Sequence, residues 1–301
     1  MGAKAPFSIT RAFGALTGAV GLSACAGGAL DPKGPVGAAE KLILIDALAI
    51  MLAIVIPVIV ATLLFAWWFR ASNTSARRLP DWDFSGRIEL VVWSIPCLVV
   101  LFLGGLTWAG SHDLDPAKPL ASKTKPLEVQ VVSLDWKWLF IYPEQKVASV
   151  NVLVVPAGTP VHFSLTSASV MNAFFAPQLG SMIYTMGGMV DQLNLQADRP
   201  GRYLGESTHF SGDGFSGMRF WIDALTPQDF SAWVGRAQSS RGALDRDAYL
   251  ALEQQSQGVA PTTYRDVPPG FFQAIATQML PSGPGPKHGS PSPVVSPKTG
   301  D

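Results

Sequence analysis

The stretch LILIDALAIMLAIVIPVIVATLLFAWWF, residues 42–69, decides the architecture of this chain. As a tilted α-helix rising about 1.5 Å per residue, it is long enough to cross about 30 Å of hydrocarbon. Asp46 lies near one end, where its carboxylate can reach the interface, and a membrane span tolerates Pro57 because neighbouring groups satisfy the freed backbone. Trp67 and Trp68 close the other end as interfacial anchors. We therefore expect a first transmembrane helix at 42–69.

A second apolar run follows at residues 90–111 and contains no charged side chain. Trp93 and Trp108 lie near its two ends, as interfacial tryptophans do. Glu89 comes directly before the run, so we expect a second transmembrane helix at 89–111 with a carboxylate at its mouth. Position alone leaves two interpretations of Glu89 open, an interfacial charge that reaches water or a group that takes up protons.

The loop between the two runs, residues 70–88, is rich in positive charge. It carries Arg70, Arg77, Arg78 and Arg87. The basic side chains of residues 25–41, on the other side of the first run, are Lys33 and Lys41. The positive-inside rule therefore places the loop in the cytoplasm and both flanks on the exported side.

The composition supports a membrane protein and excludes several other classes. Hydrophobic residues make up 48% of the chain and charged residues 15%, whereas soluble domains have about 25% charged residues. The mean hydropathy is +0.25. Lys and Arg number 22, as do Asp and Glu, so no nucleic acid or other polyanion is indicated as a partner. Two cysteines, Cys25 and Cys97, exclude a disulfide-rich scaffold and a Cys-rich metal cage.

The N-terminus resembles an export signal. Lys4 and Arg11 precede an apolar run that is too short to span a bilayer, and the run ends in Leu-Ser-Ala-Cys. This ending resembles a bacterial lipoprotein signal, in which cleavage occurs before a lipidated cysteine. We predict a signal peptide at 1–24, a lipidated Cys25 and an exported segment at 25–41. An ordinary signal peptide and a thiol without a role are the alternatives.

The pattern changes to short β-type runs after the second apolar run. They are LEVQVVSLDW (127–136), WKWLFIYP (136–143), NVLVVP (151–156), VHFSLTS (161–167), RYLGES (202–207) and MRFWIDAL (218–225). Runs of this length, bounded by Gly, Pro and Asn turns, predict an antiparallel β-sandwich or barrel, which we place in an exported domain at 112–225.

The segment 226–280 has a helical period instead. Thr226-Pro227 is typical of an N-cap followed by proline at the first helical position, and amphipathic stretches follow at 245–255 and 270–280. The tail, 281–301, is rich in Pro, Gly and Ser without periodicity, which indicates disorder.

Two further motifs favour ordinary structure over chemistry. Residues 212–217, GDGFSG, satisfy G-x-G-x-x-G, but a strand-like run follows instead of the helix that a dinucleotide site needs. We therefore expect a glycine-rich loop between strands. His112, His162, His209 and His288 are not spaced as ligand pairs, and no G-x-S-x-G elbow supports a hydrolase.

Three stretches together resemble subunit II of haem–copper respiratory oxidases. They are Glu89 with VVWSIP, SLDWKW at 133–138, and LTSASVMNAFFAPQLGS at 165–181. The resemblance runs from about Cys25 to Met279 and is nearest to the quinol-oxidase branch, the cytochrome bo type. It implies a membrane-anchored all-β protein with two N-terminal transmembrane helices, an exported cupredoxin-like β-sandwich or barrel, and short C-terminal helices.

The chain departs from the cytochrome c oxidase branch where that branch binds a dinuclear copper centre. The corresponding positions here are Asn172, Ser207, His209, Ser211, Phe215 and Met218. Copper of that type needs thiolate and imidazole donors, and both thiolates are replaced by hydroxyls. The resemblance therefore implies no metal and no complete active site in this chain, and no exchange with soluble cytochrome c.

The same resemblance implies a role within a complex. The complex would oxidise ubiquinol, reduce oxygen to water and pump protons across a bacterial inner membrane. Haems and copper would belong to subunit I, with smaller membrane subunits beside it. Glu89 would lie at the mouth of a proton channel. The rival interpretations are a cytochrome c oxidase subunit II and a non-enzymatic, membrane-tethered binding module.

Overall fold

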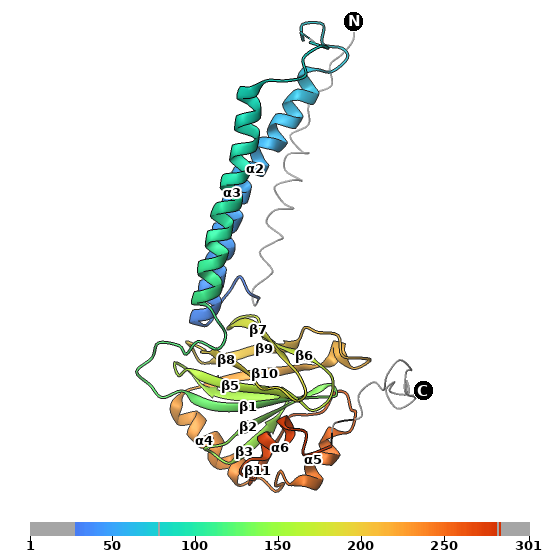
Figure 1. Ribbon diagram of the computed structural model, residues 1–301. Coiled ribbons are helices and arrows are strands. Elements are labelled where there is room, and N and C mark those ends of the chain that lie inside the picture. The colour runs from blue at the N-terminus through green and yellow to red at the C-terminus, as the bar shows by residue number, and fades with distance from the viewer. Residues whose placement is uncertain (1–27, 78, 282, 284–301) are drawn as a thin grey trace, which may run out of the picture. The chain divides into compact units, whose positions relative to one another are not determined.

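The computed structural model describes residues 28–77, 79–281 and 283 (Figure 1). It consists of a helical unit, residues 38–118, and a β-rich unit that contains residues 28–37 and those from 119 onward. The predicted signal peptide, Cys25 and most of the predicted tail lie outside the described residues.

The helical unit is an antiparallel pair, α2 (Pro35–Trp68) and α3 (Gly86–Asp113). Both helices are long and apolar enough to cross a membrane. They lie side by side in Figure 1, and a Cβ added at Gly110 would come 2.7 Å from Ile43 Cδ1. Helix α2 begins well before the predicted span because Pro35 suits the first helical turn. The spans 42–69 and 89–111 remain predictions, since no membrane boundary is defined by the fold.

The β-rich unit contains two sheets. Sheet A has the order β11 (Thr262–Arg265), β3 (Val147–Val150), β2 (Lys137–Tyr142), β1 (Leu127–Leu134), β5 (Val161–Ser167) and β8 (Asp191–Leu195). Sheet B has the order β4 (Val152–Pro156), β10 (Arg219–Leu225), β9 (Gly201–Ser207), β6 (Asn172–Ala176) and β7 (Gly180–Thr185). The prediction of a β-sandwich is confirmed.

The pairing of the strands is mixed, so the expectation of a purely antiparallel sandwich was wrong. Strand β1 pairs with β5 in parallel, and β10 pairs with β4 in parallel. The reason is that the chain passes from sheet A to sheet B after β3 and returns for β5. Strands β3, β4 and β5 therefore alternate between the sheets, so β5 pairs in parallel with the earlier strand β1 and β4 with the later strand β10.

Strand boundaries also differ from the prediction. The first predicted run ends too late, because Trp136 has φ 65° and occupies the left-handed turn between β1 and β2. Strands β3, β6, β7 and β8 were missed, since β3 has only four residues and β8 (DQLNL) begins with two polar side chains, while β6 and β7 pair irregularly. Between β6 and β7 the register shifts at Phe175 and Ala176, opposite Gly180.

Aromatic side chains fill the space between the sheets. Trp138 and Phe140 come from sheet A, and Phe174 and Phe220 from sheet B. The rings of Phe174 and Phe220 stack at 5.1 Å, and the Trp138 and Phe174 rings meet edge to face at 5.5 Å. This packing holds β6, β9 and β10 in place, and these three strands adjoin the positions where copper ligands lie in the cytochrome c branch.

The C-terminal arm, residues 226–280, covers the outer face of sheet A. It contains α4 (Pro227–Gln238), α5 (Arg246–Glu253), β11 and α6 (Phe271–Ala276). The predicted cap is confirmed, since the Thr226 hydroxyl accepts from the Asp229 N–H at 3.2 Å. Tyr249 of α5 and Phe272 of α6 pack in a second apolar cluster with Leu139 of β2. The arm also adds β11 to the edge of sheet A, which a purely helical segment would not do.

Candidate functional site

The former copper position, defined here as Asn172, Ser207, Ser211 and Met218, is a closed network of neutral groups. The Ser207 hydroxyl donates to Asn172 Oδ1 at 3.2 Å, and the Ser207 N–H donates to the Met218 carbonyl at 3.1 Å. The Ser211 hydroxyl lies 4.0 Å from Met218 Sδ. All four residues are buried. The structure therefore brings together four of the six positions that the sequence singled out.

The side chains at the other two positions, His209 and Phe215, turn away from this network, while their carbonyls accept from the Ser207 hydroxyl at 3.4 Å and from the Met218 N–H at 3.0 Å. The His209 ring packs edge to face on Tyr184 at 5.8 Å, and the Phe215 ring packs on Phe210 at 5.7 Å. His209, Phe210 and Phe215 lie in the loop between β9 and β10, and Tyr184 belongs to β7. Hydroxyl, amide and thioether groups do not provide the thiolate and imidazole donors that a dinuclear copper centre needs. The residues at the former copper position therefore do not fit that group.

The glycine-rich loop at 212–217 is shaped by Trp136. The Trp136 indole N–H donates to the Ser211 carbonyl at 3.0 Å. A Cβ added at Gly214 would come 2.3 Å from the Trp136 ring, and Gly212 has φ 110°. Glycine is therefore required for a close approach and for a left-handed turn. The prediction of an inter-strand loop is confirmed, because strand β10 follows at Arg219.

A cluster of charged groups lies where the C-terminal arm meets sheet A, and sequence reasoning missed it. The Lys137 ammonium donates to the Gln254 carbonyl and to the Ser256 hydroxyl, each at 2.7 Å, and to the Asp135 carbonyl at 3.1 Å. Asp135 accepts from the Ser169 hydroxyl and, at 3.0 Å, from Gln255 Nε2. We call Asp135, Lys137 and Glu253 the arm cluster.

Burial perturbs two of these groups. Desolvation lowers the pKa of Lys137 to about 8, against the opposing effect of Asp135 and Glu253. Desolvation raises the pKa of Glu253 to about 7, and Tyr249 lies 3.4 Å from it as a hydrogen-bond donor. The sequence signal was a lysine between two tryptophans in a strand-like run. Its partners Gln254 and Ser256 could not be foreseen, because they lie more than a hundred residues away.

Glu89 lies in the first turn of α3, where its carboxylate is exposed. Its Oε2 accepts a hydrogen bond from the Trp93 indole N–H at 3.0 Å. The two residues are four apart and therefore on one face of the helix. This contact fixes one carboxylate oxygen and leaves the other without a hydrogen bond from Trp93.

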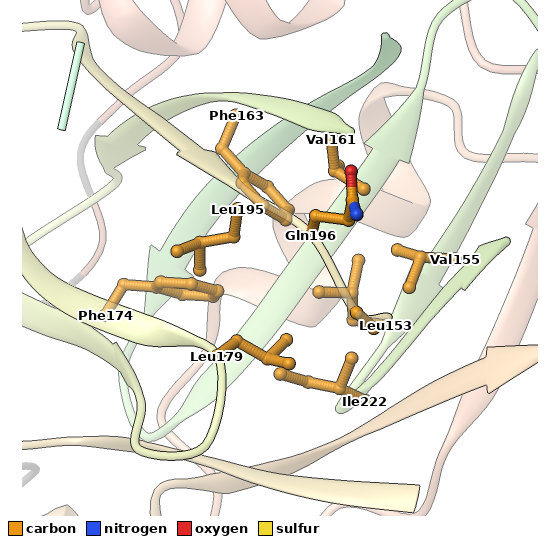
Figure 2. Close-up of a pocket in the computed structure, with 10 residues that line it drawn as sticks. Leu153, Val155, Val161, Phe163, Phe174, Leu179, Leu195, Gln196 and Ile222 are labelled. Carbon is orange, nitrogen blue, oxygen red and sulfur yellow. The ribbon is translucent and has the colours of Figure 1, made fainter. Parts of the chain in front are cut away.

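The interior of the sandwich offers no room for a cofactor. The cavity between the sheets has a volume of about 10 Å³ and is lined by apolar side chains and by Gln196 (Figure 2). Phe163 and Phe174 close one side, and Leu153 and Ile222 the other. A volume of this size is at the lower limit for a single water molecule.

The histidines within the described residues have ordinary contacts. His162 Nδ1 lies 3.0 Å from Asn194 Oδ1, and His112 Nδ1 lies 2.7 Å from the Trp108 carbonyl. Within the same residues, no group of three His, Cys, Asp or Glu side chains could hold a metal ion. His288 and Cys25 lie outside the described residues.

Two known protein families match two successive segments of the β-rich unit. The family described as "Cytochrome C oxidase subunit II, periplasmic domain" matches residues 142–225. The family "COX Aromatic Rich Motif" matches residues 238–281, most of the C-terminal arm. Among solved structures, the periplasmic domain of subunit II of cytochrome oxidase (CoxB) of Bradyrhizobium japonicum aligns with 39% of this chain and 98% of its own length, at 23% identity and TM-score 0.37.

Whole-chain relatives decide between the two branches. Ubiquinol oxidase subunit 2 of Acetobacter aceti is 50% identical over 268 residues, covering 88% of this chain and 87% of the relative. Cytochrome bo(3) ubiquinol oxidase subunit 2 of Pseudomonas aeruginosa is 50% identical over 248 residues, covering 82% of this chain and 75% of the relative. The cytochrome c oxidase alternative is therefore not favoured. The chain belongs to the ubiquinol oxidase subunit 2 family.

Proposed function

We propose that this chain acts as subunit 2 of a proton-pumping complex that oxidises ubiquinol and reduces oxygen to water. The observation that carries the proposal is the 50% identity to a ubiquinol oxidase subunit 2 over 88% of the chain. The former copper position supports the same branch, because its neutral network cannot relay electrons from a soluble protein. A lipid-soluble donor that reaches the haem-bearing subunit directly needs no such relay.

The partners follow from this assignment. Haems and copper belong to subunit I, smaller membrane subunits complete the complex, and soluble cytochrome c is not a partner. This chain contributes two helices, α2 and α3, and an exported domain. In this proposal the chain binds no cofactor of its own.

The proposed location is a bacterial inner membrane. A family of periplasmic domains matches residues 142–225, and two candidate spans lie between this segment and the start of the chain. The arginine-rich loop, residues 70–88, then lies in the cytoplasm. Cys25 carries a lipid at the mature N-terminus, which puts both ends on the periplasmic side. Mass spectrometry of the mature N-terminus tests the lipid, and an unmodified Cys25 would contradict it.

Glu89 takes up protons at the cytoplasmic mouth of α3. Its exposed carboxylate follows the arginine-rich loop directly, on the side from which consumed and pumped protons come. Trp93 holds one carboxylate oxygen through the 3.0 Å hydrogen bond. The side chain is thereby oriented while its other oxygen can exchange a proton with water.

Co-purification tests the proposed function. The chain, tagged at its C-terminus, is extracted from its native membranes in mild detergent and analysed for haem. We expect haem and the other oxidase subunits to accompany it in constant ratio. A chain that leaves the membrane without haem would instead be a membrane-tethered binding module, and the proposal would be wrong.

A further inference from the structure

Helices α2 and α3 line an open, shallow groove of about 550 Å³ that the oxidase assignment does not use. Its lining includes Asp46, Ala49 and Ile50 of α2 and Leu101, Phe102 and Gly105 of α3. A Cβ added at Gly105 would meet no atom within 4 Å, so this part of the groove is open. Its volume lies within the range of small-molecule sites.

The groove has a polar end and an apolar floor. Gly110 of α3 lies opposite Ile43 of α2, so the next turn of α2 brings Asp46 to the level of Leu106. Leu106 is two residues inside Trp108, which marks the interface. Beyond Asp46 the groove runs toward the middle of the span between Ile50 and Leu101. An amphipathic ligand would therefore place its polar group at the Asp46 carboxylate and its apolar part along the floor of the groove.

Asp46 forms no ion pair with the described residues of its own unit. Lys41 is five residues earlier and therefore faces another side of α2. A carboxylate at the edge of the hydrocarbon is costly without a donor, and a cationic head group at the interface can supply one where the described residues form no ion pair.

We propose that the groove binds a phospholipid whose head group carries a primary ammonium. The ammonium donates a charge-assisted hydrogen bond to Asp46, and one acyl chain lies over Ala49, Phe102 and Gly105. A choline head group has no N–H to donate, and an anionic glycerol head group is repelled by the carboxylate. The site therefore selects by head group, which a purely apolar groove would not do. The proposal requires only that the chain lies in a bilayer, whatever the complex oxidises.

Photo-crosslinking in the purified complex tests this site. The complex is reconstituted separately with phosphatidylethanolamine, phosphatidylcholine, phosphatidylglycerol and ubiquinone, each carrying a diazirine on its apolar chain. We expect phosphatidylethanolamine to label the peptide that contains Leu101 and Phe102. Asp46→Asn removes the charge and should lower this labelling about tenfold. Leu48→Asn is the matched control, because Leu48 lies on the opposite side of α2 and should leave labelling unchanged.

Four outcomes would overturn the proposal. They are equal labelling by the choline lipid, labelling that does not respond to Asp46→Asn, labelling by ubiquinone instead of the amine lipid, and protection of the groove by another subunit. Haem is measured in the same preparation. The absence of haem would contradict the oxidase assignment. The labelling pattern alone would still decide whether the groove binds the amine lipid.

Discussion

The former copper position and the Glu89 site differ in what their polar groups can still do. At the former copper position, Ser207 and Asn172 satisfy each other inside a buried network. At the start of α3, the Glu89 carboxylate is exposed and holds one hydrogen bond, from Trp93. The first region is closed to chemistry and the second is open to protons. The difference fits our proposal that the β-rich unit acts as a scaffold and that Glu89, at the start of α3, takes up protons.

This comparison makes a general prediction about variants. Changes in the β-rich unit should alter stability and leave turnover per haem unchanged. Changes at Glu89 should alter turnover and leave stability unchanged. Each experiment below measures both quantities on the purified complex.

The largest effect is expected from Lys137→Met in the arm cluster. The change removes the ammonium that donates to Gln254 and Ser256 and leaves their oxygens without this donor. Hydrogen bonds to charged groups contribute about 1.5–3 kcal/mol, so the unfolding free energy of the β-rich unit should fall by about 2–3 kcal/mol. Limited proteolysis of the C-terminal arm during a thermal ramp measures this loss.

Lys125→Met is the matched control for that change. Lys125 is exposed and pairs with Glu144 at 2.6 Å, and an exposed ion pair contributes at most about 1 kcal/mol. Equal losses from the two variants would show that the arm cluster does not hold the arm. A drop in turnover per haem in Lys137→Met would break the division between scaffold and chemistry.

Glu89→Gln should give the next effect, on the order of a tenfold drop in turnover per haem, because an amide cannot take up a proton. The amide can still accept the Trp93 hydrogen bond, so helix α3 and haem content should be unaffected. Glu89→Asp should retain more activity than Glu89→Gln. Oxygen uptake measured across pH checks the order. Equal turnover for wild type and Glu89→Gln would leave Glu89 as an interfacial charge.

Trp93→Phe distinguishes the effect of the Glu89 carboxylate itself from the effect of its orientation by Trp93. It removes the 3.0 Å hydrogen bond to Glu89 and keeps the acid. We expect a smaller loss of turnover than in Glu89→Gln. A larger loss would assign the role to Trp93 itself.

A smaller effect on stability is expected from Ser207→Ala. The change removes the donor to Asn172 Oδ1 and leaves a buried acceptor without it, which costs about 1–2 kcal/mol. Turnover per haem should not change, because no electron passes this network. Thermal unfolding and oxygen uptake, measured together, check both halves. A loss of ubiquinol-driven turnover without a loss of stability would reopen a catalytic role for the former copper position.

The smallest effect is a pH dependence at Glu253. Its folded pKa of about 7 is raised from the ordinary value of 4.5, so folding favours the protonated acid. Its contribution to stability is therefore complete at low pH and is lost as the pH rises from about 4.5 through 7. Glu253→Gln, which resembles the protonated acid, should match wild type near pH 4 and be more stable near pH 8. A variant that is less stable at both values would contradict this sign.

Local signals in the sequence predicted much of this fold. The apolar runs predicted α2 and α3, the Thr226-Pro227 pair predicted the start of α4, and six β-type runs predicted β1, β2, β4, β5, β9 and β10. These features depend on residues close together in the chain. The contact between Glu89 and Trp93 has the same character, since the i, i+4 spacing can be read directly.

Long-range features could not be read in this way. Strand β11 reaches sheet A from more than a hundred residues beyond β3, and the partners of Lys137 are equally distant. Strands β6 and β7 could not be recognised from a regular β pattern, because their register shifts near Gly180. At the former copper position, the sequence indicated which donors were lost, whereas only the structure shows that Ser207 and Asn172 satisfy one another.

The central claim is that ubiquinol, and not soluble cytochrome c, supplies electrons to the complex that contains this chain. The direct measurement is oxygen uptake per haem by one preparation of the complex, driven in turn by a short-chain ubiquinol and by reduced cytochrome c. We expect uptake with ubiquinol that continues through many turnovers and no uptake above background with cytochrome c. Uptake with cytochrome c that equals or exceeds the ubiquinol rate would contradict it.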